Sequence, residues 1–167
     1  MGNLEYNEET ITELDTKFPF LIKPSSKRGS PFHQDRGGIL HPGIDYRVVV
    51  GTNIVLLKPG IAIISDMNSD PGGYGAAIYI KHDDGTVTRY GHLSEIYTTA
   101  GEYYKTGTII GKTGGAQGAV GAGNSQGPHL HFEYRVGGKE TDPSSDNNDD
   151  KVFRFLNQGD SDDFKDD

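Results

Sequence analysis

The chain has 167 residues, of which 33% are hydrophobic and 24 are glycine, and it has no cysteine. Its length suits a single domain large enough to bury a core, and the absence of cysteine excludes a disulfide framework and a thiolate zinc site. The formal net charge is −8. With neither a basic stripe nor an apolar run near the ~20 residues of a membrane span, the composition argues against binding to nucleic acid and against a transmembrane segment.

The first segment, residues 1–17, is predicted to be a polar, acidic extension in which residues 11–14 form at most a short helical turn. It lacks the basic and apolar regions of a signal peptide. The apolar run 18–22 is expected to enter the core. The loop that follows is rich in Lys, Ser, Gly and Pro and holds His33 and Asp35. A second metal site there is one interpretation, but an ordinary surface loop is favoured, because loops run over the solvated surface.

Short strands separated by turn residues are predicted for most of the remaining chain, and the high glycine content suits many tight turns. Apolar and β-branched runs predict strands over residues 46–50, 53–57, 60–65, 75–81, 86–91, 107–111, 129–135 and 152–156. The fourth and fifth of these are expected to form a β-hairpin across Asp84-Gly85. His82, beside that turn, is expected to be exposed and is given no role. Strands this dense, without helical patterns between them, predict an antiparallel all-β fold.

Two stretches imitate other motifs and are set aside. Residues 66–70 begin like a calcium-binding loop, but Pro71 stands where an EF-hand needs glycine and Ala77 stands where it needs glutamate. The glycine-rich residues 118–123 lack the spacing and the strand–turn–helix context of a nucleotide-binding fingerprint. The whole segment 114–127 is expected to be a flexible loop, and the interpretations as a groove wall and as a plain connection both stay open.

The end of the chain, residues 144–167, is rich in Asp, Ser and Asn and is predicted to be an acidic, largely disordered tail. From Asp142 onward there are nine Asp and three Lys or Arg, a charge of −6, which leaves about −2 for the rest. Within the tail, residues 152–156 are apolar enough to dock on the domain and cover a sheet edge. Residues 158–167 are expected to contribute little to stability or activity.

The strand predicted for residues 129–135 carries the first signal for chemistry. Side chains alternate between the two faces of a strand, so His129, His131 and Glu133 share one face, while Leu130 and its alternate neighbours face the core. Neutral imidazole is a good zinc ligand and also a general base near pH 7. Two imidazoles on one strand face therefore indicate a metal or catalytic site rather than an ordinary surface.

Two further segments upstream add to this signal. His41 and Asp45 are four positions apart, and Pro42 and Gly43 argue against a helix, so this even spacing puts both side chains on one side of an extended segment. His92 lies between these two regions of the sequence. Spacing alone leaves open which histidines bind a metal, because both members of a His-x-His pair can ligate one zinc ion.

Taken together, HPGID at 41–45, RYGHL at 89–93 and GPHLHFEY at 127–134 resemble the motifs of lysostaphin-type (LytM-type) zinc endopeptidases, which cut peptidoglycan. The resemblance covers roughly residues 18–143, the predicted catalytic domain, and implies a central twisted antiparallel sheet with a substrate groove. The family's usual Gly-x-Arg ahead of the first ligand has only Lys27-Arg28-Gly29 as a counterpart here. The resemblance implies one Zn²⁺ per chain, held by His41, Asp45 and His131, with His92 and His129 as catalytic histidines that do not bind the metal.

The resemblance implies an extracytoplasmic zinc metalloendopeptidase that acts as a monomer on peptide cross-links or bridges of peptidoglycan, in wall lysis or remodelling. A phage-encoded lysin is one such protein. The alternative is an inactive LytM-like module that binds the wall or activates other hydrolases, which the presence of all five motif residues disfavours. A phosphocarrier domain would leave His41 and Asp45 without a role. A structural virion part with an inactive site is a further alternative. The motifs do not specify which peptide bond is cut.

Overall fold

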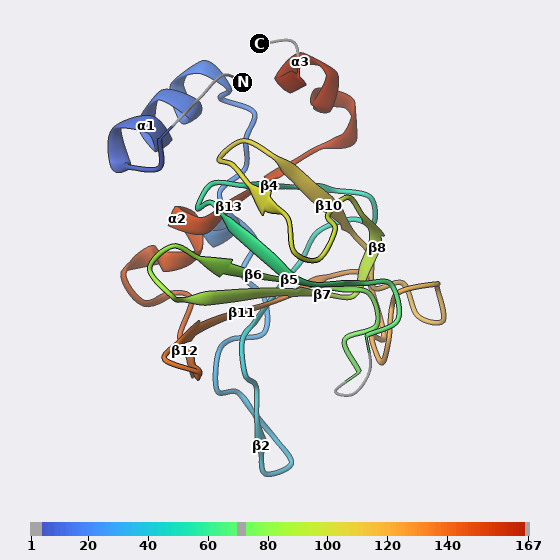
Figure 1. Cartoon of the computed structure of the whole chain (residues 1–167). Helices are drawn as coiled ribbons and strands as arrows, with labels where there is room; N and C mark the ends of the chain where they lie inside the picture. Colours follow the sequence, from blue (N-terminus) through green and yellow to red (C-terminus); the bar gives the residue numbers. More distant parts are fainter. Residues whose placement is uncertain (1–4, 70–72, 166–167) are drawn as a thin grey trace.

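The computed structural model describes residues 5–69 and 73–165, and two antiparallel β-sheets form its centre (Figure 1). The larger sheet contains, in spatial order, β12 (Lys139–Thr141), β11 (Leu130–Val136), β7 (Val87–Gly91), β6 (Ala77–His82), β5 (Gly60–Asp66) and β9 (Tyr103–Tyr104), with β3 (Ile44–Tyr46) paired to β11. The smaller sheet contains β13 (Phe153–Leu156), β4 (Asn53–Leu56), β10 (Ile109–Thr113) and β8 (Leu93–Ile96). The prediction of an antiparallel all-β fold is confirmed.

Short helices and one separate hairpin complete the fold. The helices are α1 (Glu8–Lys17), α2 (Asn148–Val152) and α3 (Ser161–Lys165), with 3₁₀ turns η1 (Pro24–Lys27), η2 (Ser145–Asn147) and η3 (Gln158–Asp160). The hairpin pairs β1 (Asp35–Arg36) with β2 (Ile39–Leu40), and it projects from the end of the molecule opposite α1 and α3 (Figure 1). None of the helices in the described residues is long and apolar enough to cross a membrane.

The main core lies between the two sheets and is rich in aromatic rings. Phe132 of β11 packs against Phe153 of β13 with ring centroids 4.7 Å apart, and Tyr46, Tyr90 and Phe155 surround the pair, all fully buried. Each of these strands presents its apolar side inward because alternate residues face opposite sides. The apolar alternation of β11 therefore fixes which way its polar residues point, and those residues include His131.

A smaller core at one end joins the two termini of the chain. Leu14 and Phe18 pack with Phe164 of α3 and with Leu156, and the Phe18 and Phe164 ring centroids are 5.0 Å apart. Asn7 caps the start of α1, and its side chain accepts a hydrogen bond from the Thr10 amide at 2.9 Å. The segment 1–17 therefore contains a ten-residue helix rather than a single turn, and residues 1–4 of the predicted extension lie outside the described residues.

Several expectations about individual strands are corrected. The strand predicted at 46–50 ends at Tyr46, because the HPGID segment pairs with β11 and the chain then leaves the sheet. The short strands β8, β9 and β12 were not predicted. His82 is not exposed: only 3% of its surface is accessible, and its ring is hydrogen-bonded to Pro59 O and Thr88 Oγ1. The calcium-like stretch continues into residues 70–72, which lie outside the described residues.

The prediction of a largely disordered tail is wrong for the residues that the structure describes. β13 pairs with β4 along its whole length, which confirms that residues 152–156 dock on the domain. The carboxylate of Asp149 is fully buried, where it accepts hydrogen bonds from Arg28 and Tyr46. Phe164 is 2% exposed, so the end of the chain also contributes to a core. The tail is polar on average, but its few apolar residues are concentrated where they can be buried.

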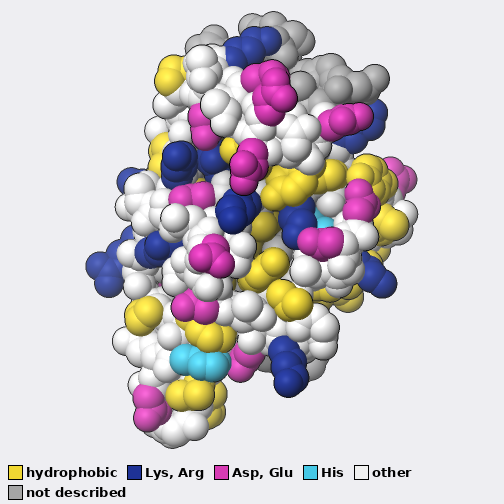
Figure 2. Space-filling model, turned by 90° about the vertical axis from the view of Figure 1, so that its left-hand side faces the viewer, with side chains coloured by type: hydrophobic (Ala, Val, Ile, Leu, Met, Phe, Trp, Pro, Cys, Tyr) yellow, Lys and Arg dark blue, Asp and Glu magenta, His cyan; other side chains and the backbone are white. Residues whose placement is uncertain are grey.

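Charges are mixed over the surface. On the face drawn in Figure 2, Lys and Arg side chains alternate with Asp and Glu side chains, and no large area of one sign is visible. Apolar side chains are exposed at the lower tip in that view, where the β1–β2 hairpin carries Ile39 and Leu40, 74% and 48% exposed. The hairpin tip is therefore an apolar projection beside a mixed surface.

Candidate metal centre

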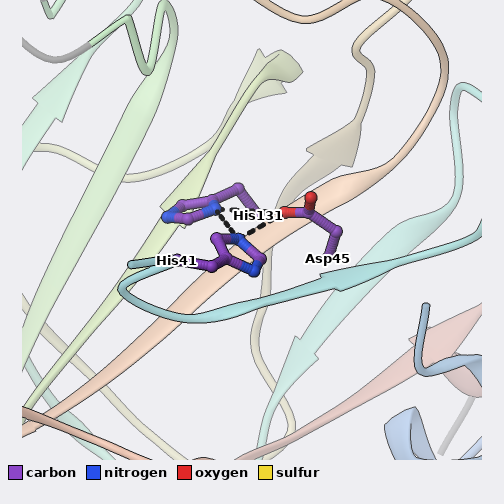
Figure 3. A group of neighbouring side chains, drawn as sticks. All are labelled: His41, Asp45 and His131. Atoms are coloured by element: carbon purple, nitrogen blue, oxygen red, sulfur yellow. Dashed lines mark hydrogen bonds and ion pairs between the residues drawn. The ribbon is translucent and has the colours of Figure 1, made fainter. Parts of the chain in front are cut away.

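Three side chains converge at the junction of β3 and β11 (Figure 3). Asp45 Oδ1 lies 3.1 Å from both His41 Nε2 and His131 Nδ1, and the two nitrogens are 3.3 Å apart. A tetrahedral zinc ion with ligands at about 2.0–2.1 Å separates its donor atoms by about 3.3 Å. The spacing of the three donor atoms therefore matches three corners of such a tetrahedron.

Hydrogen bonds on the outer side of the His41 and His131 rings determine which nitrogen of each neutral ring carries the proton. His41 Nδ1 lies 2.9 Å from Pro31 O, which can only accept, so the proton of the neutral ring is on Nδ1 and Nε2 carries a lone pair. His131 Nε2 lies 2.7 Å from a carboxylate oxygen of Glu133, so its Nδ1 carries the lone pair. With both rings neutral, the two inward nitrogens and Asp45 Oδ1 present three lone pairs to one point, an arrangement that suits a cation.

The local sequence explains why the three residues meet. Asp45 of β3 pairs with His131 of β11, and Ile44 pairs with Phe132. The two backbones are so close at Gly43 that a Cβ atom there would lie 2.1 Å from Phe132 O, so only glycine fits. His41 is held in turn by hydrogen bonds of its backbone with the Gln34 carbonyl and the His33 amide, at 3.0 and 2.8 Å.

The electrostatics of the cluster favour a cation. Burial alone would lower the pKa of His131, but the hydrogen-bonded carboxylates of Asp45 and Glu133 outweigh it and raise the pKa. Burial alone would raise the pKa of Asp45, but hydrogen bonds with His131 and His41 and the guanidinium of Arg36 hold it far below its usual range. Arg36 donates from Nη2 to Asp45 Oδ2 at 2.9 Å, on the oxygen that does not face the two histidines.

Glu133 is a residue of this site to which the sequence analysis gave no role, although alternation placed it on the face of His131. Its side chain is fully buried, and Oε1 accepts hydrogen bonds from Arg135 Nε and Nη2 at 2.9 and 2.7 Å. Tyr74 donates to Oε2. Burial would raise the pKa of Glu133, but the hydrogen bond with His131 and these other partners lower it to about 2. The carboxylate is therefore ionised and fixes the orientation of the His131 ring.

The two remaining histidines of the motifs lie beside the cluster. The rings of His92 and His129 have centroids 4.8 Å apart, and His129 Nε2 is 3.7 Å from Asp45 Oδ1. His129 Nδ1 lies 2.8 Å from Gly127 O, so the neutral ring carries its proton there and presents the Nε2 lone pair to the site. Burial, with smaller effects from His129 and His131, lowers the pKa of His92 to about 4. Both rings are thus available to hold or move a proton.

His92 has an unusual backbone. Its φ is 60°, a left-handed conformation uncommon for residues other than glycine, and its amide donates to Tyr74 O at 2.8 Å. Its ring atom Nδ1 is buried without a hydrogen-bond partner in the described part of the chain. Strained backbone and an unpartnered buried polar atom are both typical of functional sites.

A groove runs over this centre. Residues 124–128 line one side of it, and Ile39 and Leu40 of the hairpin and Tyr74 line other parts. The end of the segment 114–127 therefore forms a groove wall, and Ser125 braces it through hydrogen bonds to Gly115 O and Gly127 O at 2.7 and 2.8 Å. His33 does not join the centre; its Nε2 lies 3.6 Å from Glu140. Within the described residues, the only three-residue group able to hold a metal ion is His41, Asp45 and His131.

Several curated proteins are similar in sequence over most of the chain. The DD-carboxypeptidase/endopeptidase Mpg of Neisseria meningitidis serogroup B is 34% identical over 139 residues, which cover 79% of this chain and 30% of that protein. The peptidoglycan DD-endopeptidase ShyC of Vibrio cholerae is 37% identical over 103 residues, which cover 62% of this chain and 22% of that protein. The chain thus spans less than a third of the length of either relative.

Several solved structures share the fold. The catalytic domain of the antimicrobial peptidase lysostaphin from Staphylococcus simulans superposes with a TM-score of 0.60 at 25% identity, covering 84% of this chain and 97% of that domain. A zinc-containing peptidase from Vibrio cholerae superposes with a TM-score of 0.56 at 27% identity, covering 73% of this chain and 36% of that one. Residues 39–143, more than half of the chain, match Peptidase family M23. The chain therefore belongs to peptidase family M23 and has the lysostaphin-type catalytic fold.

Proposed function

We propose that this chain is a zinc-dependent endopeptidase that hydrolyses peptide cross-links of peptidoglycan, acting outside the cytoplasm as a monomer. The observation that carries the proposal is the convergence of three lone pairs from His41, Asp45 and His131, at tetrahedral spacing, beside two histidines that are not needed to hold the metal. Family membership and the names of the relatives support the substrate class, and the DD-endopeptidase activity in those names is extended here to this chain.

In this proposal the metal has one function and the protein has several. A bound zinc ion supplies Lewis acidity, which polarises the scissile carbonyl and makes water acidic near neutral pH. His129 accepts the proton of the attacking water at Nε2, because its Nδ1 proton is held by Gly127 O. His92 stays neutral near pH 7 and offers a hydrogen bond to the negative charge that develops on the carbonyl oxygen. Either ring can then return a proton to the leaving amine.

The groove supports this division of tasks. Its walls hold an extended peptide against the centre, and Glu133 keeps the ligand ring of His131 from rotating. An inactive wall-binding module is the second function from the sequence analysis. It is not favoured, because such a module has no need for five converging side chains with their protons fixed by outward hydrogen bonds.

The proposal is tested with purified protein and isolated walls of different cross-bridge types, with released fragments identified by mass spectrometry. We expect cleavage that stops on removal of zinc and one zinc ion per chain by metal analysis. His131→Ala should lose most of the zinc, because few ligands remain. His92→Ala and His129→Ala should each keep the zinc and lose on the order of 10²–10⁴ in rate. Unchanged zinc in His131→Ala, or near-normal turnover in either catalytic variant, contradicts the assignment.

A further inference from the structure

The groove differs in charge from the rest of the molecule. Among the described residues, its charged lining residues are Arg36, Arg47 and Asp45, a net formal charge of +1 before any metal is added. Because the formal net charge of the whole chain is −8, the residues outside the groove lining carry a net charge of −9. Bound zinc would add two further positive charges. A positive cleft in a negative molecule focuses the field on anionic groups, so the groove suits a substrate that carries negative charge.

Only one of the two groove cations is without a partner. Arg36 is bound to Asp45 Oδ2. Arg47 lies two residues beyond Asp45, its side chain is exposed, and its guanidinium makes no hydrogen bond or ion pair with any residue that the structure describes. Its backbone amide donates to Lys27 O at 2.8 Å, which fixes where the residue leaves the sheet. Arg47 therefore presents an unneutralised cation beside the metal ligands.

The side chain of Arg47 is oriented by the backbone beneath it. A Cβ atom at Gly29 would lie 2.9 Å from Arg47 Nε and 3.0 Å from Arg47 Cγ, so the arginine lies closely over this glycine. Gly29 is itself held by the hydrogen bond from its amide to Asp45 O at 2.7 Å. The same strand that positions the ligand Asp45 thus also positions the guanidinium.

Arg47 also lies where the groove continues into a second hollow. Arg47 and Pro128 line both, and the rest of the hollow is lined mainly by apolar side chains, with Lys27, Thr52 and Asn157 as its polar members. The charged side chains of the hollow are Lys27 and Arg47, with no Asp or Glu in its described lining. A peptide that passes from the metal centre into this hollow must pass the free guanidinium.

We propose that Arg47 forms a subsite for a free carboxylate of the peptide substrate, close to the bond that is cut. The planar guanidinium offers two parallel N–H donors that match a carboxylate, and carboxylates are the ordinary anionic groups of peptides. This inference rests on the proposed function and deepens it. It predicts that the substrate is an acidic peptide with a free carboxylate next to the scissile bond, rather than a neutral one such as a glycine bridge.

The test uses two cross-linked peptides that differ only in one group next to the scissile bond, a free carboxylate in one and a carboxamide in the other. For zinc-loaded wild-type protein we expect kcat/KM to be roughly tenfold higher for the carboxylate peptide, the usual effect of one charge-assisted hydrogen bond. Arg47→Gln should lose this preference by lowering only the carboxylate rate, and Arg47→Lys should keep part of it. Lys81→Gln, an exposed cation outside the groove, is the matched control and should behave as wild type.

Binding gives a readout that does not depend on catalysis. Titration calorimetry in the His129→Ala background should show roughly tenfold tighter binding of the carboxylate peptide, and Arg47→Gln in that background should abolish the difference. Equal affinities for the two peptides, or an equal loss for both in Arg47→Gln, overturn the carboxylate subsite. Absence of cleavage of both peptides and of isolated walls, with the binding preference intact, would instead count against the proposed function.

Discussion

At the scale of single residues, the ability of the centre to hold a metal depends on which nitrogen of the His131 ring carries the proton. Glu133 accepts the Nε2 proton and so directs the Nδ1 lone pair inward, and Arg135, Arg89 and Tyr74 hold the carboxylate in turn. The charge of this buried carboxylate is balanced by the two guanidinium groups, so the orientation of His131 does not depend on the metal alone. We infer that Glu133 is a positioning residue rather than a ligand.

The corresponding prediction is that Glu133→Gln lowers zinc affinity by about 10–100-fold, the usual effect of removing an outer partner of a ligating histidine. Competition with a chelator measures the affinity. Replacing zinc with cobalt shows whether the geometry of the metal site changes. A loss of stability alone would not change that geometry. Glu140→Gln, a change at a residue outside the centre and the groove, is the control and should bind zinc as wild type does. Equal affinities in the two variants would remove the positioning role.

His82 should make the stability of the protein depend on pH, far from the metal centre. Burial lowers the pKa of His82 from 6.5 to about 4 in the folded protein. Between these values the unfolded chain binds a proton that the folded protein does not, so stability is fully present above pH 6.5 and is lost as pH falls toward 4. The loss from this residue amounts to roughly 3 kcal/mol.

Urea unfolding at a series of pH values measures this loss for the wild type and for His82→Gln, whose amide can replace the hydrogen bonds to Pro59 and Thr88. Release of a bound metal at acid pH should lower the stability of both proteins equally, so it cancels in the comparison. The wild type should therefore lose stability relative to His82→Gln as pH falls from 6.5 to 4. Parallel pH profiles of the two proteins would show that His82 is not the group responsible.

At the scale of elements, the short motifs predicted which side chains meet at the centre. Composition did not predict the burial of His82 or the order of the tail. Strand alternation and the order of the motifs indicated that His41, Asp45 and His131 belong to one site, and the structure brings them together. The proposed division between these residues and His92 and His129 came from the family resemblance and stays a prediction. The burial of His82 could not be found, since its partner Pro59 lies 23 residues away across the sheet. The order of the tail could not be found either, because composition averages over a segment, whereas β13 depends on where Phe153, Phe155 and Leu156 stand when the strand pairs with β4.

The region after residue 143 lies beyond the part that matches the family, yet it supports β3. Asp149 accepts two hydrogen bonds from Arg28, at 2.8 and 2.7 Å, and one from Tyr46, which follows Asp45 in β3. β13 adds Phe153 and Phe155 to the main core. The domain boundary suggested by the motifs therefore does not coincide with the boundary of the core.

We accordingly predict that a chain ending at Pro143 does not fold, because the main core loses β13 and Arg28 loses its buried partner. The single variant Asp149→Asn should fold with stability lower by about 3–5 kcal/mol, the usual cost of breaking a buried ion pair. Circular dichroism and urea unfolding measure both. Asp146→Asn, on the exposed turn before it, is the control. A folded, zinc-binding chain that ends at Pro143 would contradict this account.

At the scale of the whole molecule, the groove and the two ends of the chain occupy opposite parts of the structure. The hairpin β1–β2, which lines the groove, projects at one end, whereas α1 and α3 lie together at the other (Figure 1). The small core that joins α1 to α3 shares no residue with the groove lining. Stability contributed by this end should therefore be separable from metal binding and from cleavage.

The last prediction follows from this separation. A chain ending at Asn157 loses Phe164, which is 2% exposed and packs on Phe18 and Leu14, so its free energy of unfolding should fall by about 1.5–3 kcal/mol. Phe164→Ala should reproduce most of that loss and serves as the matched variant. Zinc content and the rate of wall cleavage at 25 °C should stay unchanged in both, because no residue of α3 lines the groove. Loss of zinc from the shortened chain, with the fold intact, would show that the two ends of the molecule are coupled.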